Sequence, residues 1–334
     1  MRYLESLNLA LDQIMSDNQN AVIIGEDIKD PYGGAFKVTK GLSSKYGHRV
    51  ISSPISESSI VGLGIGLSLN GFKPIVEIMF GDFITLCADQ IINGASKFPW
   101  MYGSNFDLPM IIRTPMGGRR GYGPTHSQTL ESLFFNIPNI KIISPSIFHD
   151  PGQILKDTFY KMKELNLFIE NKISYPNEII LKEQVDDYNI SIINNNTDFV
   201  TLSLVFDRQT RPDIVLLTYG GMSNICFEVA RDLFIEEEII IEIIIPSLVK
   251  PVPFSDFHES IISCGKLVIV EEGISICGWG SMITSNLNDE LFDSLKAKPV
   301  IVGSKEFPIA SSRKLEDKIL PQKSDIKKAI LKIL

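Results

Sequence analysis

Cysteine is scarce in this sequence: the 334 residues contain only Cys87, Cys226, Cys264 and Cys277, and no two of them form a Cys-x-x-Cys pair. So few and such widely spaced cysteines argue against a disulfide framework and against a zinc site. Cys87, Cys226 and Cys264 lie in apolar or helical surroundings, which is typical of small buried thiols. The sequence therefore predicts a protein of the reducing cytoplasm.

Long apolar runs and clusters of basic residues are also missing. No stretch of about 18 apolar residues exists to span a membrane, and the first five residues lack the basic-then-apolar pattern of a signal peptide. The net charge is -8 and the 32 lysines and arginines are scattered, which argues against a nucleic-acid-binding surface. A composition of 44% hydrophobic and 22% charged residues is that of a globular protein long enough for two domains.

Apolar segments alternate regularly along the chain. Leu4, Leu7, Leu11 and Ile14 recur at helical spacing and predict an amphipathic helix over residues 2–17. Runs rich in Ile and Val predict strands at 21–25, 73–79, 109–113, 141–144 and 167–170. Helices are predicted between them at 58–69, 82–97 and 150–164. This alternation favours an α/β fold with a parallel sheet and helices on both faces.

Polar stretches at 186–189 and 194–197 interrupt the alternation and have the composition of a linker or an edge strand. Beyond them the pattern resumes, with strands predicted at 214–218, 239–245 and 267–271 and helices at 225–236 and 282–295. The sequence thus predicts a first domain over 1–185, a linker over 186–200 and a second, smaller α/β domain over 201–334.

Glu57 occupies an unusual position, where a strand end turns into an apolar, glycine-rich helix. A charge buried there loses solvation, so a carboxylate kept at such a place usually meets a group that uses its proton. The alternative is an acid stabilised by the helix dipole. Gly62, Gly64 and Gly66 in this helix miss the dinucleotide-binding spacing by one residue, which argues against a nicotinamide site.

Further segments at characteristic spacing accompany Glu57. They are Ile23-Ile24-Gly25-Glu26-Asp27, the stretch 32–42, Phe80-Gly81-Asp82-Phe83, Asp89-Gln90 and the loop 121–128 with His126-Ser127-Gln128. In this order they resemble the β subunit of the thiamine-diphosphate-dependent decarboxylating component of 2-oxo-acid dehydrogenase complexes, within the transketolase-like superfamily. The resemblance covers nearly the whole chain. It implies a pyrimidine-binding domain over 1–185 and a transketolase C-terminal-like domain over 201–334.

The resemblance also implies roles for three side chains. Glu57 would bind the aminopyrimidine of thiamine diphosphate and activate the cofactor for decarboxylation and for acyl or aldehyde transfer. Phe83 would stack on the aminopyrimidine, whereas Phe80 is expected to point elsewhere. His126 would face the cofactor and the substrate carbonyl and stabilise the developing oxyanion.

Other charged residues carry weaker expectations. Arg119 and Arg120 could attract a substrate carboxylate or a phosphorylated sugar, but adjacent arginines in a loop are usually solvated, and their role stays open. The remaining histidines are expected to be structural or surface residues: His48, His149 and His258.

One half of the expected cofactor site is missing from the sequence. The family holds the cofactor diphosphate through Mg²⁺ bound by a Gly-Asp-Gly motif and a later asparagine, and this chain contains no Gly-Asp-Gly. Hard oxygen ligands for the metal are therefore expected on an α subunit, in an α₂β₂ heterotetramer with a β₂ core. Ile245-Pro246-Ser247 departs from the Asp-Leu-Arg common in the family, which leaves docking to a lipoyl acyltransferase core open.

Two alternative functions stay open beside the oxo-acid dehydrogenase β subunit. The chain could be the C-terminal half of a split transketolase, because the Gly-Pro-Thr-His sequence that ends at His126 also resembles transketolases. It could also be a non-catalytic structural subunit, although such a subunit would be free to lose Glu57. The sequence does not name the oxo acid, the acyl acceptor or the α partner.

Overall fold

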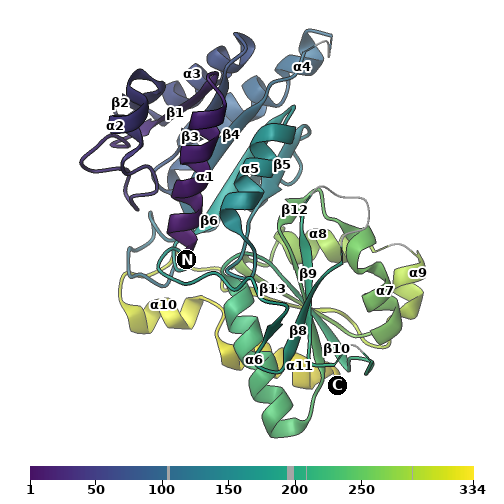
Figure 1. The fold of residues 1–334 in the computed structure, drawn as a ribbon. Helices are drawn as coiled ribbons and strands as arrows, with labels where there is room; N and C mark the ends of the chain where they lie inside the picture. The colour runs from purple at the N-terminus through teal and green to yellow at the C-terminus, as the bar shows by residue number, and fades with distance from the viewer. Residues whose placement is uncertain (104–105, 194–198, 208, 288) are drawn as a thin grey trace.

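The structure, a computed structural model, describes residues 1–103, 106–193, 199–207, 209–287 and 289–334. Figure 1 shows two α/β units, one formed by the purple-to-teal first half of the chain and the other by the green-to-yellow second half. Within the described ranges each unit is built on a seven-stranded sheet. The predicted architecture of two α/β domains is confirmed.

The first sheet is parallel except at one edge. Its strands follow the order β12-β5-β6-β4-β3-β1-β2, and β12 runs antiparallel to β5. The strands are β1 (Ala21–Glu26), β2 (Val50–Ser53), β3 (Lys73–Glu77), β4 (Met110–Met116), β5 (Ile140–Ile143), β6 (Leu165–Asn171) and β12 (Leu248–Lys250). β1, β4 and β6 are buried along their whole length, which explains why apolar residues predominate in them.

Helices cover both faces of this sheet, as predicted. α1 (Tyr3–Asp17) and α5 (Pro151–Lys161) lie next to each other on one face, where Leu11 and Phe159 belong to the same core (Figure 1). α3 (Glu57–Leu69) covers the other face and contributes Ile60 to a second core. The shorter helices of this half are α2 (Leu42–Tyr46), η1 (Gly47–Arg49), η2 (Gly81–Cys87), η3 (Gln90–Ala95), α4 (Phe98–Met101) and η4 (Glu131–Phe134).

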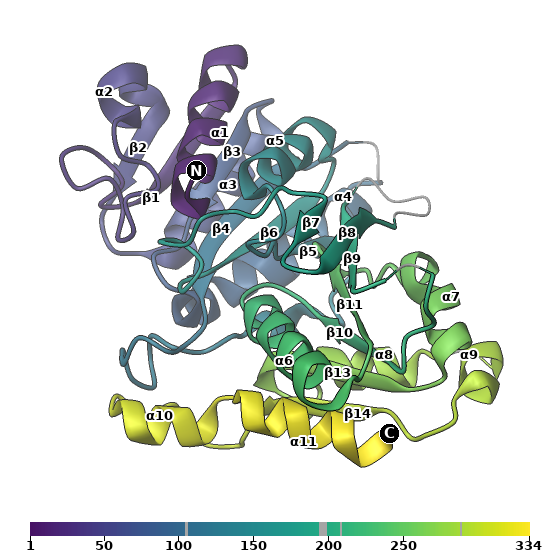
Figure 2. The same ribbon diagram turned by 60° about the horizontal axis from the view of Figure 1, so that its bottom comes forward.

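The second sheet is mixed and has the order β14-β13-β10-β11-β9-β8-β7. Its strands are β7 (Gln184–Val185), β8 (Tyr188–Ile192), β9 (Thr201–Val205), β10 (Ile214–Thr218), β11 (Ile241–Pro246), β13 (Leu267–Ile274) and β14 (Val300–Ser304). Its helices are α6 (Met222–Glu237), α7 (Phe254–Cys264), α8 (Trp279–Ser285), α9 (Asp289–Ser294), α10 (Arg313–Ile319) and α11 (Lys323–Ile333). α10 extends from this half toward the first half (Figure 2).

The single α-helix predicted over 82–97 is wrong. The chain instead forms the 3₁₀ helix η2 followed by the π-helix η3. Close packing accounts for the difference: a Cβ atom on Gly81 would clash with Met116, and one on Gly94 would lie 2.9 Å from Ile65 Cδ1. Packing against neighbours therefore overrides the local periodicity here, and π-helical turns are frequent at functional sites.

Two other segments differ from the expectation. The helix predicted over 282–295 is divided into α8 and α9, because Asn286 follows α8 and its side chain donates a hydrogen bond to the Met282 carbonyl at 2.7 Å. Residues 188–192 of the predicted linker form β8, and the predicted polar tract at 194–197 lies outside the described residues. The domain limits themselves stay a prediction.

The cysteines are free thiols, as their spacing suggested. Cys87, Cys226 and Cys264 are buried and Cys277 is exposed. Burial raises the pKa of the Cys87 and Cys226 thiols to about 12, so both are neutral packing groups at neutral pH. No helix among the described residues is long and apolar enough to cross a membrane.

Candidate active site

Glu57 is the first residue of α3 and lies near the carboxyl end of β1. Its surface is only 6% exposed. Burial and then the charge of Glu57 raise the pKa of Glu26 at the end of β1, and the same two causes raise the pKa of Cys87 on η2. Among the described residues the Glu57 carboxylate forms no side-chain hydrogen bond or ion pair. Because such burial is unfavourable, the arrangement favours a ligand as the partner of Glu57.

Phe83 and His126 are brought into contact. Phe83 lies on η2 and His126 in the loop between β4 and η4, and their ring centroids are 5.2 Å apart at 78°. The Phe80 ring centroid lies 4.8 Å from that of His126 and 5.8 Å from that of Phe83. The expectation that Phe80 points elsewhere is therefore wrong. The Phe83 N–H donates to the Phe80 carbonyl in a 3₁₀ turn, which places residues three apart on the same side.

Polar contacts hold the loop that carries His126. Gln128 Nε2 donates to Asp82 Oδ1 at 2.9 Å and ties the loop to η2. Lys172, which is buried, donates from Nζ to the His126 carbonyl. Burial lowers the pKa of Lys172 to about 8, although the charges of Asp82 and Glu272 act in the opposite direction. His126 Nδ1 lies 3.0 Å from Thr125 Oγ1, which leaves Nε2 as the ring nitrogen for a ligand.

The three predicted site residues all lie at the carboxyl edge of the first sheet. β2 leads to Glu57, β3 leads to Phe83 and β4 leads to the loop with His126. η2 connects them, because it carries Phe83 and contacts α3, which begins with Glu57. In open α/β sheets this edge is where ligands bind.

Unsatisfied polar atoms gather at the same edge. Within the described part of the chain, the buried side-chain atoms that have no hydrogen-bond partner include Glu26 Oε1, Asp82 Oδ2, Gln90 Oε1 and Ser127 Oγ. Buried polar atoms are normally paired, so a group of unpaired ones indicates a missing polar ligand. Together with Glu57 and the aromatic rings, they are candidate contacts for a ligand that is partly polar and partly aromatic.

The two loop arginines differ in their surroundings. Arg119 donates from Nη2 to the Pro321 carbonyl at 2.5 Å, so its guanidinium is engaged with the second half of the chain. Arg120 is exposed, donates to the Lys172 carbonyl at 2.9 Å and lies 5.6 Å from the Tyr122 ring centroid. Of the pair, only Arg120 presents its charge at the surface next to the aromatic cluster.

A buried ion network beneath the site was not foreseen from the sequence. Arg113 donates to both oxygens of Glu170, at 2.7 and 2.8 Å, and to Glu77 Oε2 at 3.0 Å. Burial raises the pKa of Glu77, and the charge of Arg113 opposes this increase. Charged residues inside the apolar runs of adjacent strands are the signal that could have revealed this network.

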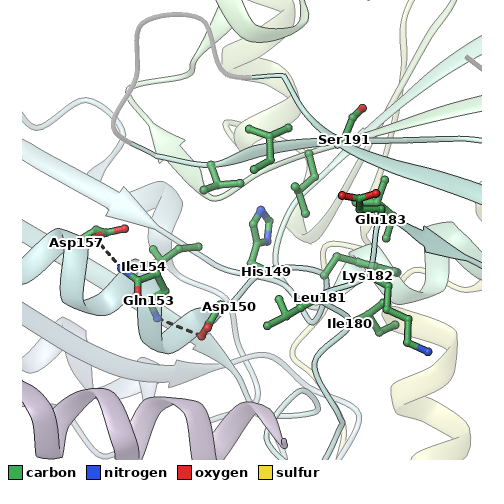
Figure 3. A pocket seen from close by; sticks show the side chains of 15 residues that line it. His149, Asp150, Gln153, Ile154, Asp157, Ile180, Leu181, Lys182, Glu183 and Ser191 are labelled. Carbon is green, nitrogen blue, oxygen red and sulfur yellow. Dashed lines mark hydrogen bonds between the residues drawn. The ribbon is translucent and has the colours of Figure 1, made fainter.

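A cavity of about 310 Å³ opens elsewhere, between α5 and β8–β9 (Figure 3). It contains none of Glu57, Phe83 and His126 and is lined mainly by apolar side chains. His149 in its wall accepts a hydrogen bond on Nδ1 from the Ser146 N–H at 3.0 Å. Burial lowers the pKa of His149 to about 4, so its imidazole is neutral at physiological pH. The His149 Nε2 atom is buried and has no hydrogen-bond partner in the described part of the chain, and the structural role expected from the sequence stays a prediction.

Comparison with known proteins places this fold in a class. Residues 1–176 match the family model of the transketolase pyrimidine binding domain, and residues 204–326 match that of the transketolase C-terminal domain. A solved structure described as a split gene transketolase, inactive beta4 tetramer, has a TM-score of 0.74 and 19% identity and covers 100% of this chain and 98% of that chain. Transketolase from Campylobacter jejuni has a TM-score of 0.66 and 13% identity and covers 99% of this chain and 46% of that chain. The fold is therefore that of a transketolase-like protein with two domains.

Sequence relatives narrow this class. The chain is 35% identical over 314 residues to the pyruvate dehydrogenase E1 component subunit beta of Gracilaria tenuistipitata var. liui, covering 93% of this chain and 92% of that one. It is 32% identical over 338 residues to the acetoin:2,6-dichlorophenolindophenol oxidoreductase subunit beta of Cupriavidus necator, covering 98% of this chain and 96% of that one. The chain belongs to the family of transketolase-like E1 β subunits.

Proposed function

We propose that the chain is the β subunit of a thiamine-diphosphate-dependent 2-oxo-acid dehydrogenase (decarboxylating) and is active only with an α partner. The observation that carries the proposal is Glu57, a residue only 6% exposed with no side-chain partner among the described residues. It begins the helix α3, which contacts η2, and η2 carries Phe83 in contact with His126. The E1 β relatives support the reaction class.

The residues present fit thiamine diphosphate. Glu57 would donate a hydrogen bond to the aminopyrimidine ring nitrogen, and Phe83 would stack on the same ring. The unpaired atoms Glu26 Oε1 and Gln90 Oε1 are further polar groups for a ligand at this edge. When bound, the cofactor supplies an acidic thiazolium carbon and an electron-accepting ring for decarboxylation.

In the proposed reaction, side chains of this subunit hold or donate protons and exclude water from the site. Glu57 holds a proton at the aminopyrimidine nitrogen, and its burial limits competition by water for that hydrogen bond. His126 Nε2 donates to the substrate oxygen on which negative charge develops. Phe80 and Phe83 exclude water from the space between these groups. Arg120, exposed beside this cluster, is the residue proposed to attract the substrate carboxylate.

An apolar surface next to the site supports an α partner. α3 carries apolar residues all round, and its Leu63 and Leu69 are exposed together with Leu86 on the adjoining η2. Trp100 and Tyr102 extend the exposed apolar surface at α4. Surfaces of this kind usually mark protein interfaces. We place there an α subunit that carries the diphosphate-binding motif and Mg²⁺, in an α₂β₂ heterotetramer with a β₂ core.

The proposal also covers the acyl acceptor and the cellular compartment of the enzyme. We propose lipoamide on an acyltransferase as the acyl acceptor, because relatives are named as E1 components. We propose the cytoplasm as the location, because all four cysteines are free thiols.

A split transketolase is the alternative within enzymes. It rests on the shared fold at 19% identity, and a fold alone does not specify a reaction. Identities of 32% and 35% to oxidoreductase and dehydrogenase subunits favour the oxo-acid reaction.

The experiment is reconstitution of the enzyme with the product of a neighbouring gene that encodes Gly-Asp-Gly followed by asparagine. Activity is measured as reduction of 2,6-dichlorophenolindophenol by a panel of 2-oxo acids with thiamine diphosphate and Mg²⁺. Glu57→Gln should lower kcat by about 10²–10⁴-fold, as for loss of a general acid–base group. Glu259→Gln, at an exposed position of α7, is the matched control and should retain activity.

Two results would contradict the proposal. Ketol transfer from a sugar phosphate, without oxidation of any 2-oxo acid, would favour the split transketolase. Full activity of Glu57→Gln would show that Glu57 does not activate the cofactor and would remove the main argument against a non-catalytic subunit.

A further inference from the structure

The loop that leads to His126 is bound by a carboxylate from the other half of the chain. Glu316 on α10 is 1% exposed, and its Oε1 accepts a hydrogen bond from the Arg119 N–H at 2.7 Å. Its Oε2 accepts a second bond from the Gly121 N–H at 3.2 Å. Figure 2 shows α10 alongside this loop. One side chain thus pairs with two backbone donors of a segment almost 200 positions earlier in the sequence.

The segment around α10 also fits tightly against the loop. A Cβ atom on Gly118 would lie 2.7 Å from Leu320 Cδ1, and one on Gly123 would lie 2.6 Å from Ser311 Oγ. Arg119 has a φ of 68° and Gly121 a φ of 69°, a backbone conformation that an L-residue such as Arg119 rarely adopts. The loop conformation is therefore imposed by its tertiary contacts: the Glu316 carboxylate accepts from the Arg119 and Gly121 amides, and Glu272 accepts from the Gly118 amide at 2.6 Å.

His126 lies between this contact and a second set of restraints. After Gly121 the chain reaches His126 within five residues, and the His126 carbonyl then accepts a bond from Lys172. Gln128 follows and is bonded to Asp82. With the chain held on both sides, the position of the His126 ring against Phe83 depends on both restraints.

We propose that Glu316 is a positioning residue, which orients His126 for its reaction by holding the Arg119 and Gly121 amides. The inference rests on the proposed function of His126. The charge and both oxygens of Glu316 matter, because each oxygen accepts one bond. A glutamine has one acceptor oxygen and one NH₂ group, so Glu316→Gln would keep one bond and place a donor against the other backbone N–H.

The first test concerns the loop alone and requires no activity. The chain contains four histidines, so a histidine-labelled full chain gives few ring C–H signals in an NMR spectrum, and His126→Ala identifies the signal of His126. Glu316→Gln should shift the His126 signal and leave that of buried His149 in place. The matched control is Asp317→Asn on the same helix, which removes an equal charge at an exposed position and should shift neither signal. A folded Glu316→Gln protein with an unmoved His126 signal would overturn the proposal.

The second test uses the reconstituted enzyme. Glu316→Gln should lower kcat on the order of 10²-fold with little change in KM, since small displacements of a catalytic group have effects of this size. In a His126→Ala background the same substitution should have almost no further effect, because Glu316 acts through His126. Equal losses in both backgrounds would overturn the positioning role. If His126→Ala alone retains full activity, the proposed role of His126 fails, and the NMR comparison alone decides the loop contact.

Discussion

Replacing Arg113 by methionine should destabilise the protein strongly, because this residue neutralises two buried carboxylates. Its surface is 1% exposed, and it makes two bonds to Glu170 and one to Glu77. Burial alone would lower the pKa of Arg113, but the charges of Glu170 and Glu77 outweigh it and raise that pKa. Removal of one partner from a buried ion pair costs about 3–5 kcal/mol. A typical domain has a total stability of about 5–15 kcal/mol, so a large share would be lost.

The loss should also depend on pH, with a defined sign. The pKa of Glu77 is already raised by burial, and without the opposing charge of Arg113 it should rise further. A carboxyl group whose pKa is higher in the folded than in the unfolded state stabilises the fold fully below the unfolded pKa, and this contribution disappears as pH rises through the folded pKa. The difference between Arg113→Met and wild type should therefore shrink as the pH falls from 8 toward 5.

Urea unfolding at pH 8 and pH 5.5, followed by far-UV circular dichroism, measures both effects. The control is Lys141→Met, which breaks a partly exposed ion pair with Glu164 and should change stability by no more than about 1 kcal/mol. A loss below about 1 kcal/mol for Arg113→Met at pH 8, or an equal loss at both pH values, would show that the network does not carry buried charge.

The remaining predictions concern the cofactor and the loop. The purified chain alone should not bind thiamine diphosphate with Mg²⁺ tightly in calorimetry, because the diphosphate-binding motif is expected on the α subunit; tight stoichiometric binding would contradict the divided site. Lys172 has a pKa of about 8 in the folded state, below the ordinary value of about 10.4, so the unfolded state binds more protons between these values and stability should rise with pH there. Burial also lowers the pKa of Lys250 to about 8, so urea unfolding at pH 7.5 and 9.5 should show a smaller rise in Lys172→Met than in wild type, and an equal rise in both proteins would contradict the contribution of Lys172.

Much of the fold follows from short-range patterns in the sequence. The strands at 21–25 and 214–218 and the helix at 2–17 were predictable because buried parallel strands are unbroken apolar runs and amphipathic helices repeat every three to four residues. Short edge strands such as β2 and β7 were not predictable, because an edge strand buries too few side chains to produce an apolar run in the sequence. The winding of η2 and η3 was missed because it depends on what packs against them.

For the candidate site too, the sequence determined some features and the tertiary structure determined others. The sequence determined which chemical groups are present: a carboxylate at a strand-to-helix turn, an aromatic pair and a histidine in a glycine-rich loop, in an order that identifies the family. Only the tertiary structure decided that Phe80 joins Phe83 against His126, that Arg119 is engaged with Pro321, and that Glu316 binds the loop. The reason is physical, since these contacts join residues far apart in the chain, and local periodicity carries no information about which distant groups will meet.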